Sequence, residues 1–261
     1  KKNLVSYLYL PFRAIHLARS LISQEKNIRL RVLLFHDIPK DSHGLFQQKL
    51  EFLSKRWNFI SVQDFGDYLE GKTMLRGDNL LLSFDDGFRS NRLVAEEILN
   101  PMGIKALFFV VSEFIKLTNQ EDQIKFIKTN LYPQCRDQEF PENLSEMKSL
   151  SYEDLSYLID AGHTIGCHTA THSDLSKITD KKHLTHEIVD SANSLEKELG
   201  IKIEHFAFGF GNVSFFNKSA LQIARSRFPY VYTGMRGDNA RSMNPWAIRR
   251  DTIPIDDSFH L

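Results

Sequence analysis

The chain has 261 residues, of which 42% are hydrophobic and 25% are charged, and this composition excludes a disordered protein. Lysine plus arginine equals aspartate plus glutamate at 33 each, so no summed charge attracts nucleic acid, and we expect no nucleic-acid partner. The length fits one domain of barrel or sandwich size. Cys135 and Cys167 have unrelated surroundings and are interpreted as free thiols, a usage found in reducing compartments and also in many exported enzymes.

Residues 1–28 form a predicted N-terminal helical segment, ahead of a single catalytic domain expected over residues 29–261. Apolar positions within residues 1–25 roughly follow helical spacing, but basic residues interrupt them, and no run approaches the ~20 residues of a membrane span. An amphipathic helix of this kind packs on the domain or makes peripheral contact with a membrane. The expected location is cytoplasmic or membrane-peripheral, or exported if a precursor segment has been removed.

From residue 30 onward, short β-rich runs alternate with helical patterns, which predicts an α/β fold with a parallel sheet or barrel inside a layer of helices. Two of the runs are almost continuously apolar, as strands covered on both faces are. The expected strands are residues 32–35, 59–62, 80–84, 106–111, 163–167, 205–208, 230–233 and 247–253. Residues 112–150 are polar and longer than an ordinary connection, which is typical of an insertion that shapes a site or is mobile.

Two adjacent carboxylates, Asp85 and Asp86, follow the buried strand at 80–84 and precede a helix expected over residues 89–99. The carboxyl ends of strands form the mouth of a β/α fold, where chemistry occurs, and Gly87 permits the turn into the helix. One aspartate could cap that helix, but capping does not explain both. Adjacent like charges raise each other's pKa unless a cation intervenes, so the pair indicates a metal site.

His168 and His172 begin where the expected strand at 163–167 ends. Two imidazoles four residues apart converge on one ion if the segment between them turns, and imidazole with carboxylate is a normal ligand set for zinc. The sequence therefore predicts one divalent metal held by Asp86, His168 and His172, most simply Zn²⁺, with Co²⁺, Ni²⁺ or Mn²⁺ as alternatives. His163, His183 and His186 carry no such placement and are interpreted as surface or capping residues.

The two motifs together, Ser83-Phe84-Asp85-Asp86-Gly87 and His168-Thr169-Ala170-Thr171-His172, resemble those of the polysaccharide deacetylases of carbohydrate esterase family 4. The resemblance extends over roughly residues 31–254. It implies a distorted (β/α)7-type barrel and a hydrolase acting on linear amide C–N bonds. Asp85 would be the catalytic base, and the metal would be held as predicted above.

His36 follows the first expected strand, as a histidine does in the branch of the family that deacetylates poly-N-acetylglucosamine and other exopolysaccharides. The resemblance makes His36 the acid that protonates the departing amine, with His260 as a rival. Family members use a motif arginine to orient the base, but Ala207 stands at that position here. Arg250 is the expected substitute, and Arg249 is the alternative.

Residues 206–211 resemble a family motif in which proline stands where this chain has Gly209, and Phe210 and Gly211 are expected to contact substrate. Trp246, Phe210 and Phe215 could stack on a sugar ring or pack in the core. The predicted function is removal of acetate from N-acetylhexosamine units of a polysaccharide or glycan precursor. The alternatives are an O-acetyl esterase, a small-amide hydrolase, or a catalytically silent glycan-binding module.

Overall fold

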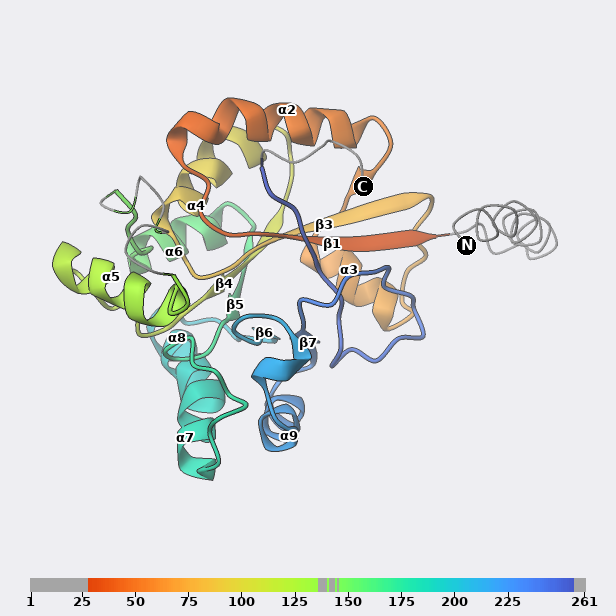
Figure 1. Ribbon diagram of the computed structural model, residues 1–261. Coiled ribbons are helices and arrows are strands. Elements are labelled where there is room, and N and C mark those ends of the chain that lie inside the picture. The colour runs from red at the N-terminus through yellow and green to blue at the C-terminus, as the bar shows by residue number, and fades with distance from the viewer. Residues whose placement is uncertain (1–27, 136–139, 141–143, 145, 256–261) are drawn as a thin grey trace, which may run out of the picture.

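A computed structural model describes residues 28–135, 140, 144 and 146–255 of the chain (Figure 1). The predicted helix within residues 1–28 and the rival acid His260 therefore lie outside the described residues, apart from Ile28 itself. No helix in the described ranges is long and apolar enough to cross a membrane.

Each of the eight runs expected to form strands contributes to one sheet, in which every pairing is parallel. The strands are β1 (Arg29–Phe35), β2 (Asn58–Phe59), β3 (Asp78–Phe84), β4 (Ala106–Val110), β5 (Thr164–Cys167), β6 (His205–Ala207), β7 (Tyr230–Tyr232) and β8 (Asp251–Thr252). Their order is β7-β6-β5-β4-β3-β1-β8. Strand β1 pairs along the whole length of one edge of β3. The other edge of β3 is shared, because β2 pairs with its first residues and β4 pairs with its last residues.

The last part of the chain connects the two edges of this sheet. Ile248 pairs with Tyr232 of β7, and a few residues later β8 pairs with Leu33 and Leu34 of β1. The predicted strand at 247–253 is therefore a bridge followed by two strand residues, because the chain crosses here from one edge to the other. This crossing curls the sheet into the distorted (β/α)7-type barrel expected from the sequence.

Helices on the outer face of the sheet complete the β/α units (Figure 1). They are α2 (His43–Ser54), α4 (Arg89–Val94) with the π-helical turn η2 (Ala95–Leu99), α6 (Tyr152–Asp160), α7 (Lys181–Thr185) with the π-helical turn η4 (His186–Asp190) and α8 (Ser191–Leu199), and α9 (Lys218–Arg227). Helix α3 (Val62–Leu69) lies across β1 and β3 from α2 (Figure 1). The strand predicted at 59–62 ends early because Ser61 and Asp64 form a capping box that starts α3.

Alternate residues of the strands pack into different apolar clusters, as the two-residue period of a strand requires. In β4, Phe108 and Val110 join the large cluster under the outer helices, whereas Leu107 and Phe109 join the cluster that contains α3. Residues 112–150 carry α5 (Gln120–Phe126) and the π-helical turn η3 (Ile127–Leu131), anchored by an apolar cluster that includes Phe114 and Ile127. The described part of the inserted segment is thus held beside the barrel, next to the carboxyl ends of β4 and β5.

Candidate active site

The carboxyl ends of four parallel strands deliver the candidate residues to one end of the barrel. His36 follows β1, Asp85 and Asp86 follow β3, His168 follows β5, and Phe210 lies shortly after β6. Neither aspartate caps α4, whose N-cap is Phe88, so the capping interpretation does not apply. These side chains line a cavity of about 500 Å³ whose walls are Leu34, His36, Asp85, Asp86, Leu131, Tyr132, Gln134, His168, His172, Phe210, Gly211, Asn212, Gly234 and Thr252.

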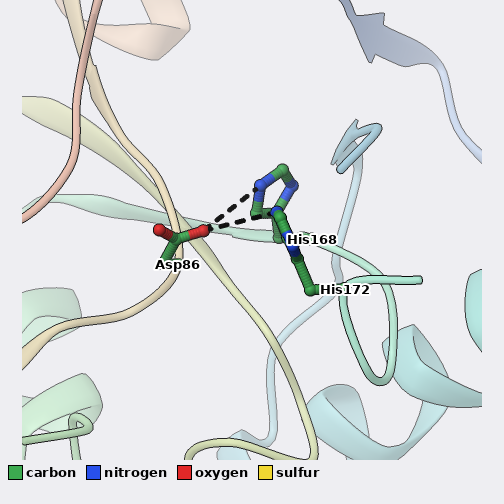
Figure 2. Close-up of side chains that lie close together, drawn as sticks. All are labelled: Asp86, His168 and His172. Atoms are coloured by element: carbon green, nitrogen blue, oxygen red, sulfur yellow. Dashed lines mark ion pairs between the residues drawn. The ribbon is translucent and has the colours of Figure 1, made fainter. Parts of the chain in front are cut away.

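The three predicted ligands lie together with the geometry of a metal site. Oδ1 of Asp86 is 3.7 Å from Nε2 of His168 and 3.6 Å from Nε2 of His172, and all three residues are buried (Figure 2). Oδ1 of Asp86 has no hydrogen-bond partner in the described part of the chain, although a buried carboxylate oxygen ordinarily requires one. The residues present therefore fit a divalent cation, which would satisfy this oxygen.

Backbone carbonyl groups set the orientation of both imidazoles. Nδ1 of His168 lies 2.9 Å from the carbonyl oxygen of Ala207, and Nδ1 of His172 lies 3.0 Å from that of Asn130. Because a carbonyl only accepts, each Nδ1 carries the proton and each Nε2 presents a lone pair toward Asp86. Ala207, where the resemblance led us to look for an arginine, thus contributes to the site through its backbone carbonyl group.

Burial keeps both histidines neutral and disfavours an isolated charge on Asp86. It lowers the pKa of His168 to about 3 and also lowers the pKa of His172. Burial, with a further contribution from the charge of Asp85, raises the pKa of Asp86 to about 7 in the metal-free protein. Two neutral imidazoles and a carboxylate that lacks a partner form a donor set that a cation would stabilise.

Unusual backbone conformations concentrate at this site. Among the described residues, the non-glycine residues with positive φ are Asp86 at 72°, Thr169 at 67°, His172 at 60° and Phe210 at 60°. Each such residue costs of order 1–3 kcal/mol and persists only where the surroundings enforce it. Gly87 has φ 85°, and a Cβ atom there would lie 3.2 Å from Cβ of Val110, so this turn requires glycine.

Arg250, expected to replace the missing motif arginine, forms a bidentate ion pair with Asp85. Its Nη1 and Nη2 atoms donate to the two carboxylate oxygens at 2.6 and 2.8 Å, and both side chains are buried. Nε of Arg250 donates to the carbonyl of Thr233 at 3.1 Å, which fixes the plane of the guanidinium. Arg249 is exposed, and its backbone pairs with Asn239, so it takes no part in this contact.

The Arg250 pair keeps Asp85 ionised. Burial alone would raise the pKa of Asp85, but the charge and hydrogen bonds of Arg250 hold it below the ordinary value. Oδ2 of Asp85 lies 3.5 Å from Nε2 of His168, so the carboxylate is beside the candidate metal site. An ionised carboxylate held in this position can accept a proton.

His36 is half-buried and lines the cavity, and its backbone carbonyl accepts a hydrogen bond from the side chain of Asn91 at 2.8 Å. Phe210 lies over His172, with ring centroids 4.4 Å apart, and it also contacts Phe215. Gly211 is a wall residue as expected. The structure thus brings His36, Phe210 and Gly211 to the same cavity as the aspartates.

Trp246, predicted to contact substrate, lies elsewhere. Its indole N–H donates to the carbonyl of Phe228, which precedes β7, and the Arg225 guanidinium stacks on its ring at 4.4 Å. Trp246 therefore sits toward the amino end of β7, against α9, and is not among the walls of the cavity. His163 is also not a surface residue, because it is buried and bonds Asn100 and the backbone of Ala106.

The sequence predicted an insertion that shapes a site or is mobile, but it did not identify which residues of the insertion do so. Leu131, Tyr132 and Gln134 line the cavity, and Asn130 contacts the turn that carries the histidines. Burial raises the pKa of Tyr132, so its hydroxyl stays protonated near neutral pH. Nothing in the local pattern distinguishes these residues from other polar residues between 112 and 150, except that the segment is longer than a connection requires.

A parallel barrel with a buried Asp-His-His group and a paired aspartate at its mouth defines a hydrolase-type centre. A family model described as polysaccharide deacetylase matches residues 73–227, which include both motifs and more than half of the chain. The chain therefore belongs to the polysaccharide deacetylase family. His36 and Arg250 lie outside the matched range.

Solved structures of low sequence identity share the fold. The Streptococcus pyogenes deacetylase PplD in complex with acetate is similar with a TM-score of 0.69 and 19% identity, over 88% of this chain and 95% of that one. IcaB from Ammonifex degensii is similar with a TM-score of 0.66 and 21% identity, over 87% of this chain and 92% of that one. A de-N-acetylase from Aggregatibacter actinomycetemcomitans is similar with a TM-score of 0.67 and 19% identity, over 88% of this chain and 97% of that one. No curated protein sequence matches the chain.

Proposed function

We propose that this protein is a metal-dependent deacetylase that removes acetyl groups from N-acetylhexosamine units of a polysaccharide or glycan precursor. The observation that carries the proposal is the buried Asp85–Arg250 pair directly beside the group formed by Asp86, His168 and His172. Family membership supports the reaction class, and the deacetylases of the same fold are consistent with it.

Asp86, His168 and His172 would hold the metal through one carboxylate oxygen and two Nε2 atoms. A divalent ion such as Zn²⁺ supplies Lewis acidity and brings the pKa of bound water down to about 7. Co²⁺, Ni²⁺ and Mn²⁺ are compatible with the same donors. Three protein ligands are the usual number at a catalytic zinc site, where further positions serve water and substrate.

Asp85 acts as the general base. Its carboxylate takes the proton of the attacking water, and the two hydrogen bonds from Arg250 keep it ionised and fixed before that transfer. Water adds to the carbonyl carbon of the acetamide. Collapse of the tetrahedral adduct then breaks the C–N bond and gives acetate and the sugar amine.

His36, which lines the same cavity, donates a proton to the departing nitrogen. General acid catalysis of this kind contributes about 10²- to 10⁴-fold. Phe210, whose ring is adjacent to His172, borders the space where the acetamide must lie, and Gly211 forms part of the wall of that space. Peripheral membrane contact through residues 1–25 and a cytoplasmic or membrane-peripheral location belong to the same proposal.

The test measures metal content of the purified protein together with acetate released from N-acetylglucosamine oligomers. We expect about one equivalent of metal and activity that disappears with a chelator and returns with Zn²⁺. Acetylated xylan and small cyclic amides serve as competing substrates. Faster turnover of either class, or activity in metal-free protein, would contradict the proposal, as would glycan binding without turnover under any metal.

A further inference from the structure

The turn that carries the metal-binding histidines, residues 168–172, is held by side chains from two separate π-helical turns. We call this segment the histidine turn. It contains Thr169 and His172 with positive φ, and a β-branched residue such as Thr169 rarely adopts that conformation. Within the turn, the backbone N–H of His172 donates to Oγ1 of Thr169 at 2.9 Å. That bond leaves other polar groups of the turn to be satisfied from outside.

Glu187 of the π-helical turn η4 satisfies one side of the histidine turn. Its Oε2 accepts the backbone N–H groups of Ala170 and Thr171 at 3.1 and 3.0 Å. Its Oε1 accepts the hydroxyl of Thr171 at 2.6 Å and that of Ser173 at 3.3 Å. One carboxylate therefore bonds three residues, Ala170, Thr171 and Ser173, which lie on both sides of His172 in the sequence.

Glu187 is fully buried, with 0% exposure, which is unusual for a glutamate. A buried carboxylate is costly unless its partners compensate, and here those partners are Ala170 and Thr171 of the histidine turn and the adjacent Ser173. His183, one helical turn away, lies 3.7 Å from Oε1 on the solvent side with a half-exposed side chain. Since π-helical turns occur frequently at functional sites, the position of Glu187 in η4 agrees with a role at the metal centre.

Asn130 of the π-helical turn η3 holds the other side. Its side-chain amide donates to the carbonyl of Thr171 at 2.8 Å, and its own carbonyl accepts Nδ1–H of His172 at 3.0 Å. Asn130 thus fixes both the backbone next to His172 and the rotation of the imidazole. The inserted segment at 112–150 acquires a defined role through this residue.

We propose that Glu187 is a positioning residue for His172, with Asn130 as its counterpart, and that together they fix the histidine turn in its metal-binding conformation before any ion arrives. The proposal rests on the metal site of the proposed function. It predicts that the acceptor oxygens of Glu187 matter, because the backbone N–H groups of Ala170 and Thr171 would otherwise be buried without partners.

Two variants of similar length separate this role from simple packing. In Glu187→Gln, the amide oxygen can accept both backbone N–H groups, while the hydroxyls of Thr171 and Ser173 rotate to accept from the amide nitrogen. In Glu187→Met, no strong acceptor remains. We expect Zn²⁺ affinity near that of the wild type for Glu187→Gln and ~10- to 100-fold weaker for Glu187→Met. The control His183→Ala, which touches Glu187 only from the solvent side, should bind Zn²⁺ like the wild type.

Zn²⁺ affinity is measured by competition with a chromophoric chelator, on variants whose far-ultraviolet circular dichroism matches the wild type. Equal affinities for Glu187→Met and the wild type, or equal losses in Glu187→Met and Glu187→Gln, would overturn the proposal. If the wild type binds no Zn²⁺ in this titration, the proposed function itself is wrong. That result differs from one in which the wild type binds Zn²⁺ and the Glu187 variants do not differ from it.

Amide hydrogen exchange of the metal-free wild type gives an independent test that needs no variant. Because Ala170 and Thr171 already donate to Glu187, we expect their amides to be protected in the absence of metal. Exchange at the rate of an exposed loop until Zn²⁺ is added would show that the ion, rather than Glu187, organises the histidine turn. That result would refute the proposal even if Glu187→Met does not fold.

Discussion

Two buried histidines on neighbouring strands show how the two ends of the barrel differ. His168 follows the carboxyl end of β5, and His205 begins β6 at the opposite end. Burial lowers the pKa of each to about 3. His205 donates to or accepts from the hydroxyl of Tyr232 at 2.9 Å and stacks on Tyr230. His168 instead faces two carboxylates, one of which has an oxygen without a partner.

The comparison shows that burial and pKa alone do not identify a functional histidine. His205 lies among apolar and aromatic residues, and it pairs there with the hydroxyl of Tyr232. The end that contains His168 combines strained backbone, adjacent carboxylates and a cavity. Such departures from stable packing concentrate at functional sites because function, rather than stability, maintains them.

The largest expected effect is that of Asp86→Asn, which keeps a residue type that tolerates positive φ. We expect activity to fall to background and metal to be lost. Since the raised pKa of Asp86, about 7, reflects the cost of its charge in the metal-free fold, the variant should be more stable than metal-free wild type by about 1–3 kcal/mol.

The sign of this difference follows from the pKa. A raised carboxyl pKa means that the ionised form destabilises the fold, so the advantage of Asp86→Asn grows as the pH rises from the ordinary value toward about 7. Urea denaturation in the presence of a chelator at pH 5 and pH 8 checks it. A variant less stable than the wild type at pH 8 would contradict the assignment of Asp86 Oδ1 as a metal ligand.

Next in size is the effect of Arg250→Gln, which leaves the buried Asp85 charge without its partner. We expect a loss of about 3–5 kcal/mol in the free energy of unfolding. Because Arg250 lowers the pKa of Asp85, its removal raises that pKa, and the acidic limb of the rate profile should move to higher pH. An unshifted limb measured on folded variant protein would show that Asp85 is not the base.

A smaller effect is expected for Tyr232→Phe, which removes the hydroxyl that pairs with His205. The change leaves Nδ1 of the buried His205 without its hydroxyl partner and should cost about 1–3 kcal/mol of stability, while Zn²⁺ affinity stays unchanged. Denaturant unfolding and metal titration of the same sample check both points. Loss of metal affinity with little loss of stability would mean that the two ends are not separate in function.

The smallest effects concern Phe210 and Trp246, the two aromatic residues that the sequence predicted to contact sugar. Phe210→Ala should raise KM for N-acetylglucosamine oligomers by ~2- to 10-fold, the amount expected for one aromatic contact. Trp246→Ala should leave KM unchanged, because Trp246 packs against Arg225 and the backbone of Phe228 away from the cavity. Steady-state kinetics on both variants would contradict the structure if Trp246→Ala had the larger effect.

Sequence patterns predicted the strands and the residues at their ends, for physical reasons. Strands such as β3 and β4 are covered on both faces, so their apolar runs stand out, and polar motifs that follow them fall at one edge. Arg250 was expected because the motif position at Ala207 lacks an arginine, and the structure places its guanidinium on Asp85.

Long-range contacts account for what the sequence did not predict. Glu187 and Asn130 look like ordinary helix residues, and only the fold brings them to the histidine turn. Trp246 was misplaced because residue type does not indicate which end of the barrel a side chain occupies. His163 was misassigned because its partners, Asn100 and Ala106, lie far away in the sequence.

The most direct test of the central claim compares the wild type with Asp85→Asn, measuring acetate release from N-acetylglucosamine oligomers and bound metal in the same samples. Asp85 lies outside the group formed by Asp86, His168 and His172, so metal content should be unchanged. Acetate release should fall by ~10²- to 10⁴-fold, because the base is removed. Undiminished acetate release from Asp85→Asn with full metal content would contradict the account.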